Sequence, residues 1–156
     1  MMFIFRARTI VPPEFAIDMS HCRRILIVDD NEDDRFFLTR ALTRHGVVAV
    51  DWVSDGEEAV EYVLRIKQGN RPELIFVDFA MDRMSGLQLL RWLRQNPVFN
   101  DIPVVVLTAS RNEEEKATAI ALRAKAVYLK PSKRDDLDVI VQKALEHCQA
   151  EDSVLV

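Results

Sequence analysis

The sequence predicts an α/β fold in which a doubly wound, five-stranded parallel sheet is covered by helices on both faces. The runs Ile75-Phe76-Val77 and Ile25-Leu26-Ile27-Val28 contain no polar residue, so each is expected to be a strand buried on both sides. Five such runs alternate with five segments of helical periodicity, and the connections between them are short. This alternation is typical of parallel strands joined by crossover helices that pack on both faces of the sheet.

Each strand and helix is assigned from its apolar spacing and its boundary residues. The strands are expected at Arg24 to Asp30, Val47 to Val53, Ile75 to Asp78, Ile102 to Leu107 and Ala126 to Leu129. The first helix is expected over Asn31 to His45, with Gly46 as its C-terminal cap. The other four helices are expected to start at polar capping residues, namely Ser54 with Glu57, Ser85, Ser110 with Glu113, and Ser132 with Asp135.

Breaker residues and apolar spacing complete the prediction for these helices. The second helix is expected to end at Gly69-Asn70 and the third at Pro97. The fourth helix is expected to bury Ala117, Ile120 and Ala121.

Composition places the chain among ordinary globular proteins. Its 156 residues are enough for one domain with a core of its own. The net charge of -4 argues against nucleic-acid binding, which favours a basic surface. No apolar run approaches the roughly 18 residues of a membrane span, and we expect a cytoplasmic protein. Cys22 and Cys148 have no metal-ligand spacing and are expected to be reduced thiols.

The domain is expected to span residues 21–150, between an N-terminal extension of residues 1–20 and a short tail of residues 151–156. Two readings of the extension are open. Met19 stands just before the first strand, so the first reading is a loose tail or a mis-called translation start. The alternative is a short arm whose Phe3, Ile4 and Phe5 pack on the domain or on a partner.

Four of the five strands end in polar residues suited to phosphoryl chemistry. The first ends in Asp29 and Asp30, the third in Asp78, the fourth in Thr108 and the fifth in Lys130. In a parallel sheet these ends lie along one edge, where such folds bind ligands. Three acids together are unfavourable unless a cation is bound, so we expect a Mg²⁺ site around a reactive aspartate. That carboxylate can attack phosphorus, while the lysine supplies positive charge and the threonine hydroxyl a hydrogen bond.

Each of these residues has an ordinary structural explanation when it is taken alone. A strand-end aspartate is usually a turn or cap residue, and Asp29-Asp30 could cap the first helix. Thr108 alone reads as a strand terminus and Lys130 as a solvated surface charge. The functional interpretation depends on the combination, because all of these groups stand in order at one edge of the same predicted sheet.

The chain resembles the receiver domains of two-component response regulators over about residues 24–150. The matching motifs are Ile25-Leu26-Ile27-Val28-Asp29-Asp30, Leu74-Ile75-Phe76-Val77-Asp78, Met84-Ser85-Gly86, Val104-Val105-Val106-Leu107-Thr108-Ala109 and Leu129-Lys130-Pro131. The lengthened segments Ile66 to Pro72 and Asn96 to Asn100 look most like those of stand-alone, phytochrome-associated regulators.

This resemblance implies a flavodoxin-like fold with strand order 2-1-3-4-5. It implies that Asp78 is the phosphoacceptor, Thr108 the switch hydroxyl and Lys130 the phosphate-contacting lysine, with a cis peptide bond between Lys130 and Pro131. It also implies that Mg²⁺ is held by Asp29, Asp30, Asp78 and the backbone carbonyl of Ala80.

Several positions depart from the pattern of that family. Asp82 replaces a usual proline and is expected either to pair with the adjacent arginine or to repel phosphate. Val127 stands where an aromatic switch residue is usual, and the adjacent Tyr128 is expected to point to the opposite face of its strand. Arg123 replaces a frequent glycine, and Ala80 is small, which leaves its backbone carbonyl available.

The predicted function is that of a signalling module and not of an enzyme. The chain is expected to accept a phosphoryl group from a histidine kinase or phosphotransferase onto Asp78 and to act through a downstream protein target. Self-association into a homodimer is a further expectation, and neither nucleic acid nor membrane is an expected partner. The alternative is a pseudo-receiver that is never phosphorylated and serves only as an interaction module. A phosphohydrolase resembling the haloacid dehalogenases is disfavoured, because Ala80 occupies the place of its second acid.

Overall fold

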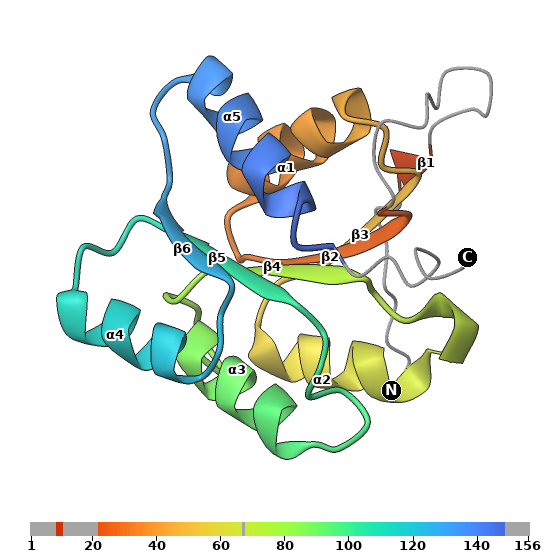
Figure 1. Cartoon of the computed structure of the whole chain (residues 1–156), viewed down its shortest axis with the longest axis vertical. Coiled ribbons are helices and arrows are strands. Elements are labelled where there is room, and N and C mark those ends of the chain that lie inside the picture. Colours follow the sequence, from red (N-terminus) through yellow and green to blue (C-terminus); the bar gives the residue numbers. More distant parts are fainter. Residues whose placement is uncertain (1–8, 11–21, 67, 149–156) are drawn as a thin grey trace.

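The computed structural model contains the five predicted parallel strands in one sheet (Figure 1). The structure describes residues 9–10, 22–66 and 68–148. Across the sheet the parallel strands follow the order β3 (Ala49–Val53), β2 (Arg24–Val28), β4 (Leu74–Val77), β5 (Val104–Thr108) and β6 (Ala126–Leu129). Counted along the chain, these five strands have the order 2-1-3-4-5 that the resemblance implied.

The sheet also has an antiparallel edge strand, β1 (Thr9–Ile10), that the sequence does not predict. It pairs with β3, with Thr9 opposite Val50 and Ile10 opposite Ala49. Two residues are too few to show the period-2 pattern of a strand, so hydrophobic periodicity cannot reveal it. The other residues singled out in the extension lie outside the described residues, namely Phe3, Ile4, Phe5 and Met19.

Helices cover both faces of the sheet, as predicted (Figure 1). On one face lie α1 (Glu32–Arg44) and α5 (Arg134–Leu145), and on the other lie α2 (Gly56–Arg65), α3 (Gly86–Gln95) and α4 (Glu113–Ala121). A short 3-10 helix, Gln68–Asn70, follows α2. None of the helices that the structure describes is long and apolar enough to cross a membrane.

Alternate residues of each central strand fill two separate cores. Ile25 and Ile27 of β2 belong to the core under α1 and α5, whereas Leu26 and Val28 belong to the core under α2 and α3. This alternation follows from the period of two of a β-strand. It explains why the central strands are apolar throughout, since both of their faces are covered.

One of the predicted polar helix starts is confirmed. Ser85 caps α3: its hydroxyl accepts a hydrogen bond from Gln88 N, and the Gln88 side chain accepts one from Ser85 N. Asp55 caps α2 and Asn112 caps α4, because their side-chain oxygens reach the unpaired N–H groups of the first turn. Lys133 precedes α5 and makes no side-chain capping hydrogen bond. Three predicted starts are therefore wrong by one or two residues, namely Ser54, Ser110 and Ser132.

The predicted buried face of α4 is wrong as well. Ala119 is fully buried, whereas Ile120 is 49% exposed and Ala117 and Ala121 are also exposed. A short helix rich in alanine and glutamate has a weak apolar periodicity, so the sequence does not indicate which stripe faces the sheet. The result is an apolar stripe on the outer surface of α4.

Two backbone conformations bear on the resemblance. No peptide bond in the described ranges is cis, so the bond between Lys130 and Pro131 is trans and the implied cis bond is wrong. The trans isomer is the intrinsically preferred form of such bonds. Arg123 has a φ of 68°, in the left-handed region that favours glycine, which explains why the family often has glycine there.

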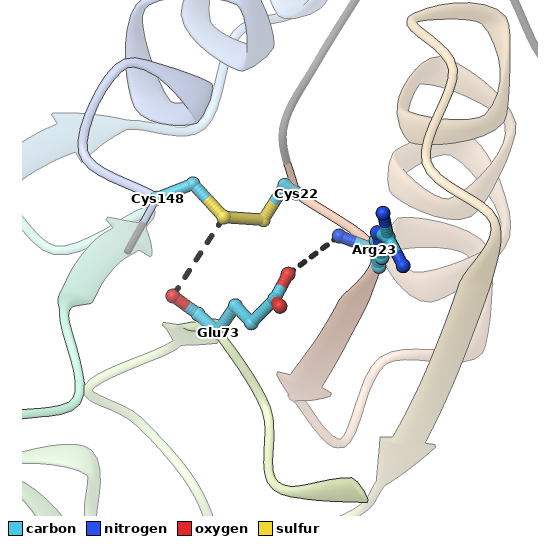
Figure 2. The surroundings of a disulfide bond; sticks show 4 residues. All are labelled: Cys22, Arg23, Glu73 and Cys148. Carbon is cyan, nitrogen blue, oxygen red and sulfur yellow. Dashed lines mark hydrogen bonds between the residues drawn. A yellow bond between two sulfur atoms is a disulfide. The ribbon is translucent and has the colours of Figure 1, made fainter. Parts of the chain in front are cut away.

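The two cysteines form a disulfide, so the expectation of two reduced thiols is wrong (Figure 2). Cys22 lies just before β2 and Cys148 lies shortly after α5, and their Cα atoms are 5.6 Å apart. The two residues are separated by 126 positions in the sequence. Their adjacency is a product of the fold, and no local spacing pattern could have indicated it.

Candidate functional site

Two neighbouring strands bring the predicted acids together. β2 and β4 pair with Val28 opposite Val77, so Asp29 and Asp78 follow side by side at the carboxyl edge of the sheet. Both are 6% exposed, whereas Asp30 is exposed. One carboxylate oxygen from each of the three aspartates lies within 4.8 Å of the others. The structure therefore brings the predicted acidic triad together.

Lys130 reaches into this acidic cluster from the end of β6. Its Nζ donates hydrogen bonds to Asp78 Oδ2 at 2.8 Å and to Asp34 Oδ2 at 2.6 Å, and it lies 2.9 Å from Asp29 Oδ2. Its side chain is 17% exposed. Lys130 N also donates to Thr108 O at 2.8 Å, which ties the end of β6 to the end of β5. One ammonium group thus neutralises part of the charge of three carboxylates.

Burial and ion pairing act in opposite directions on these groups. Burial alone would lower the pKa of Lys130, but its hydrogen bonds to Asp34, Asp78 and Asp29 outweigh burial and raise that pKa. Burial raises the pKa of Asp29, and repulsion from Asp78 adds to this effect. The Asn31 N–H and Lys130 oppose it by stabilising the charged carboxylate. Lys130 is therefore firmly protonated and holds the cluster together.

Asp34 is a site residue that the sequence reasoning missed. It lies in the first turn of α1, where its backbone N donates to the Asn31 side chain at 2.9 Å. This turn begins immediately after the Asp29-Asp30 strand end, and its acids complement the positive end of the helix dipole. A search for acids one helical turn beyond the predicted pair would have identified Asp34.

Thr108, at the end of β5, and Ala80, in the loop after β4, lie at the same edge of the sheet as the acidic cluster. Thr108 ends β5 and is 1% exposed, and its Oγ1 accepts a hydrogen bond from Ser110 N at 3.1 Å. Ala80 is exposed, and its N–H donates to Asp78 Oδ1 at 3.3 Å. The Thr108 hydroxyl proton is not used in this bond, so it can be donated to an incoming oxygen.

Gly86 has a steric role beside the site. It is buried and follows the α3 cap, and its N donates to Phe79 O at 3.0 Å. A Cβ atom at this position would collide with the backbone carbonyl of Asp78. The Met84-Ser85-Gly86 motif therefore needs glycine because α3 starts in direct contact with the backbone of Asp78.

Asp82, which replaces a usual proline, does not form the expected ion pair with the adjacent Arg83. Asp82 is exposed, and Arg83 pairs instead with Asp55 at the start of α2, with Nε to Oδ2 at 2.8 Å. Glu57 and Glu58 lie near the same guanidinium, at 3.6 and 3.9 Å. Asp82 itself has no ion pair among the described residues.

Val127 and Tyr128 point to opposite faces, as predicted. Val127 packs against the core under α2 and α3, and Tyr128 packs against the core under α1 and α5. Next to Val127 is a cavity of about 110 Å³ whose lining includes Phe79, Ser110 and Leu129. Tyr128 therefore cannot occupy the space of an aromatic residue at position 127.

A larger cavity of about 350 Å³ opens beside Lys130, between α1 and the start of α5. Its lining includes the apolar side chains of Phe37 and Leu107 and the basic side chains of Lys133 and Arg134. The edge of the sheet that carries the acidic cluster is thus next to a recess lined by both apolar and charged side chains.

The donor set fits a small divalent cation. The three clustered ligands are carboxylates, which are the groups that Mg²⁺ prefers, and two of them are buried next to each other. The mutual repulsion of Asp29 and Asp78 would be relieved by a cation. The residues that the sequence singled out for Mg²⁺ are therefore chemically suitable.

Comparison with known proteins gives consistent matches. The family described as the response regulator receiver domain matches residues 25–142. The probable methanogenesis regulatory protein FilR2 of Methanothrix harundinacea (strain 6Ac) is 28% identical over 126 residues, which cover 79% of this chain and 81% of FilR2. The response regulator MprA of Mycobacterium leprae (strain TN) is 32% identical over 130 residues, covering 83% of this chain and 54% of MprA. The chain thus spans about half the length of MprA.

Two solved structures are similar over nearly their whole length. The phosphorylated cyanobacterial phytochrome response regulator RcpA has a TM-score of 0.73 and 27% identity, covering 83% of this chain and 96% of RcpA. The Mn²⁺-bound form of the response regulator Rcp1 has a TM-score of 0.66 and 28% identity, covering 78% of this chain and 90% of Rcp1. The fold of this chain is thus the fold of two response regulators, one solved in a phosphorylated form and the other in a Mn²⁺-bound form.

Proposed function

Because the chain belongs to the response regulator receiver domain family, as its motifs predict, we propose that it is a phosphorylation switch with Asp78 as the phosphoacceptor. Receiver domains are signalling modules of two-component systems, which interact with histidine kinases and with downstream targets. The observation that carries the proposal is the convergence of residues from the ends of three separate strands. The carboxylates of Asp29 and Asp78 both lie within hydrogen-bond distance of the Lys130 ammonium group.

In the proposed reaction a carboxylate oxygen of Asp78 attacks the phosphorus of a phosphohistidine on the donor protein. The new P–O bond forms as the P–N bond to the histidine breaks, and the imidazole keeps the electron pair and takes up a proton. The product is an acyl phosphate on Asp78. Asp78 is buried enough to be shielded from bulk water, yet its Oδ2 already contacts a cation, the Lys130 ammonium at 2.8 Å.

Lys130 and Thr108 have separate roles in this proposal. The Lys130 ammonium balances the charge that the phosphoryl group brings, and it can keep one contact to the acids while it gains one to phosphate. The Thr108 hydroxyl donates a hydrogen bond to a phosphoryl oxygen, and its movement toward that oxygen is the switch. The side chain has a defined starting position, because it accepts the bond from Ser110 N.

Mg²⁺ is the proposed cofactor. Its ligands would be the carboxylates of Asp29, Asp30 and Asp78 and the backbone carbonyl of Ala80. When bound, it would screen the repulsion between these acids and the incoming phosphoryl oxygens. The Mn²⁺-bound structure of the relative Rcp1 supports a divalent ion in this family.

Two surfaces are proposed for partners. The recess of about 350 Å³ beside Lys130 lies next to the reactive edge, so it is the proposed contact for the histidine kinase or phosphotransferase. The outer face of α4 and β6 exposes Ile120 at 49% and Leu129 at 42%, and it is the proposed contact for a downstream protein or a second copy of the chain. We propose a cytoplasmic protein with no nucleic-acid partner.

The test is transfer of labelled phosphoryl groups in the presence of Mg²⁺. The chain should take up label from acetyl phosphate or from a phosphorylated histidine kinase, and Asp78→Asn should abolish uptake. Asp82→Asn is the matched control, because it removes an exposed acid four residues later and should change the rate less than about twofold. Undiminished labelling of the Asp78→Asn protein would refute the assignment. A wild-type chain that binds its partner but never takes up label would establish the pseudo-receiver alternative.

A further inference from the structure

We propose that Cys22 and Cys148 form a reversible redox site that staples the end of α5 to the start of β2 (Figure 2). The staple lies at the opposite ends of β2 and α5 from the acidic cluster. Its reversibility rests on the cytoplasmic location proposed above. Reductants keep most cytosolic thiols reduced, and the disulfides that do form there are usually transient or redox-sensing.

The backbone around both cysteines is fixed by bonds that do not involve sulfur. Arg23 N donates to Glu73 Oε1 at 2.6 Å, and Glu73 N donates to Arg24 O at 2.8 Å. On the other side, Cys148 N donates to Leu145 O at 3.1 Å and so extends the last turn of α5. The Cα separation of 5.6 Å falls within the normal range of a disulfide. The two thiols therefore stay within bonding reach after reduction, and the bond can close again without rearrangement of the fold.

The two cysteine residues differ in exposure. Cys22 is 1% exposed and belongs to the core under α1 and α5, whereas Cys148 is only partly buried and packs at the edge of that core. We therefore expect an external thiolate to attack Cys148 in preference to Cys22. This asymmetry assigns Cys148 as the attacked sulfur and Cys22 as the leaving group.

The co-reactant is a protein or small-molecule dithiol. One of its thiolates attacks Cys148 Sγ, the S–S bond breaks, and the Cys22 sulfur leaves with the electron pair and takes up a proton. The second thiolate of the dithiol then attacks the mixed disulfide and releases Cys148, which is also protonated. Two electrons and two protons pass to the chain, and the dithiol becomes a disulfide. The freed Cys148 thiol lies 3.8 Å from the Glu73 carbonyl oxygen, to which it can donate.

Reduction is expected to loosen the end of α5 without dismantling the domain. Leu137, Val141 and Ala144 keep the helix packed on the core, and Asp138 keeps its ion pair with Arg44 at 2.9 Å. The turn after Leu145, in contrast, loses its covalent anchor. The unfolded chain also loses a closed loop of more than a hundred residues, so the whole domain becomes less stable.

The experiment compares three proteins: oxidised wild type, wild type reduced with dithiothreitol, and the double variant Cys22→Ser with Cys148→Ser. The Tm of oxidised wild type should be about 10 °C or more above that of the reduced form. The double variant should have the same Tm as the reduced form, whether or not dithiothreitol is present. Amide hydrogen exchange in the last turn of α5 should be about tenfold faster after reduction, with α3 unchanged as the internal control. A thioredoxin couple at cytosolic poise should open the bond.

Three results would overturn the proposal. The first is a bond that never closes in oxidised glutathione, and the second is a bond that no cytosolic dithiol opens. The third is retention of zinc by the purified reduced chain, because the sulfurs of both cysteines and a Glu73 oxygen lie within 4.8 Å of one another and would then form a metal site. Phosphoryl uptake by Asp78, measured in both redox states, tests the proposed function separately, since its failure would leave the melting and exchange results intact.

Discussion

Lys130→Met is the substitution that most directly tests how the acidic cluster is held together. The ammonium group contacts carboxylates of Asp29, Asp34 and Asp78 at 2.6 to 2.9 Å, and methionine replaces it with an apolar chain of similar length. The variant leaves two buried carboxylates and one partly exposed carboxylate facing one another without a counter-charge. Both folding stability and metal affinity should respond.

The expected loss of stability follows from the burial of the partners. Removing one member of a buried ion pair costs about 3–5 kcal/mol, because the other member is left uncompensated. Asp34 is 40% exposed, so water can solvate it and its share is below about 1 kcal/mol. We therefore expect Lys130→Met to lose about 3 kcal/mol of folding stability without metal, the low end of that range. This loss corresponds to a fall in Tm of roughly 6–12 °C. Mg²⁺ should bind the variant roughly tenfold more tightly, by about 1.4 kcal/mol, since the competing ammonium is gone.

The assay is denaturant unfolding in EDTA and in millimolar Mg²⁺, with metal affinity from a titration followed by tryptophan fluorescence. Lys133→Met is the matched control, because it removes an exposed lysine three residues later and should shift stability by less than about 0.5 kcal/mol. Phosphoryl uptake should be lost in Lys130→Met despite the tighter metal. Wild-type stability in EDTA together with unchanged Mg²⁺ affinity would show that Lys130 does not hold the cluster.

Three further substitutions test local features of the fold and the readout. Gly86→Ala should destabilise the chain by about 1–3 kcal/mol, because its Cβ would meet backbone, whereas Gly69→Ala, in open space, should have little effect in the same thermal melts. Arg123→Gly should be more stable than Arg123→Ala by about 1 kcal/mol in urea unfolding, since both lose the charge and only glycine accepts a φ of 68° freely. The backbone amide shifts caused by a beryllofluoride phosphoryl mimic should vanish in Thr108→Ala and persist in Tyr128→Phe. The reverse pattern would identify the tyrosine as the switch.

The fold and the central site residues could be predicted because their signals are local. An apolar strand that ends in an acid, as at Asp78, gives both the burial of the strand and the position of its carboxylate. Parallel pairing then forces Asp29 and Asp78 together, since their strands are neighbours. The helix caps were less predictable. Several polar residues precede each helix, and the choice of Asp55 over Ser54 depends on which oxygen reaches a free N–H group.

Features that depend on contacts distant in sequence were not predictable. Asp34 lies one helical turn beyond Asp30, so its presence near the strand end can be read locally. Its contact with Lys130, 96 residues away, becomes visible only when α1 and β6 are placed. The sequence predicts reduced thiols because only two cysteines are present, near opposite ends of the chain and without metal-ligand spacing. The fold brings these two residues together across 126 positions. The exposed stripe on α4 was assigned to the core for a different reason, since alanine carries little information about burial.

The loop after Asp78 shows how such a distant contact can offset a local departure. A proline at the position of Asp82 would restrict the backbone of this loop by its ring, and aspartate does not. Here Arg83 instead pairs with Asp55, whose side chain is only 8% exposed, across 28 residues of sequence. Gly56 N donates to Met84 O at 3.1 Å, in a contact too close for any Cβ at position 56. These contacts from the start of α2 fix the loop in place without a proline. They explain how Asp82 is tolerated next to the acidic cluster.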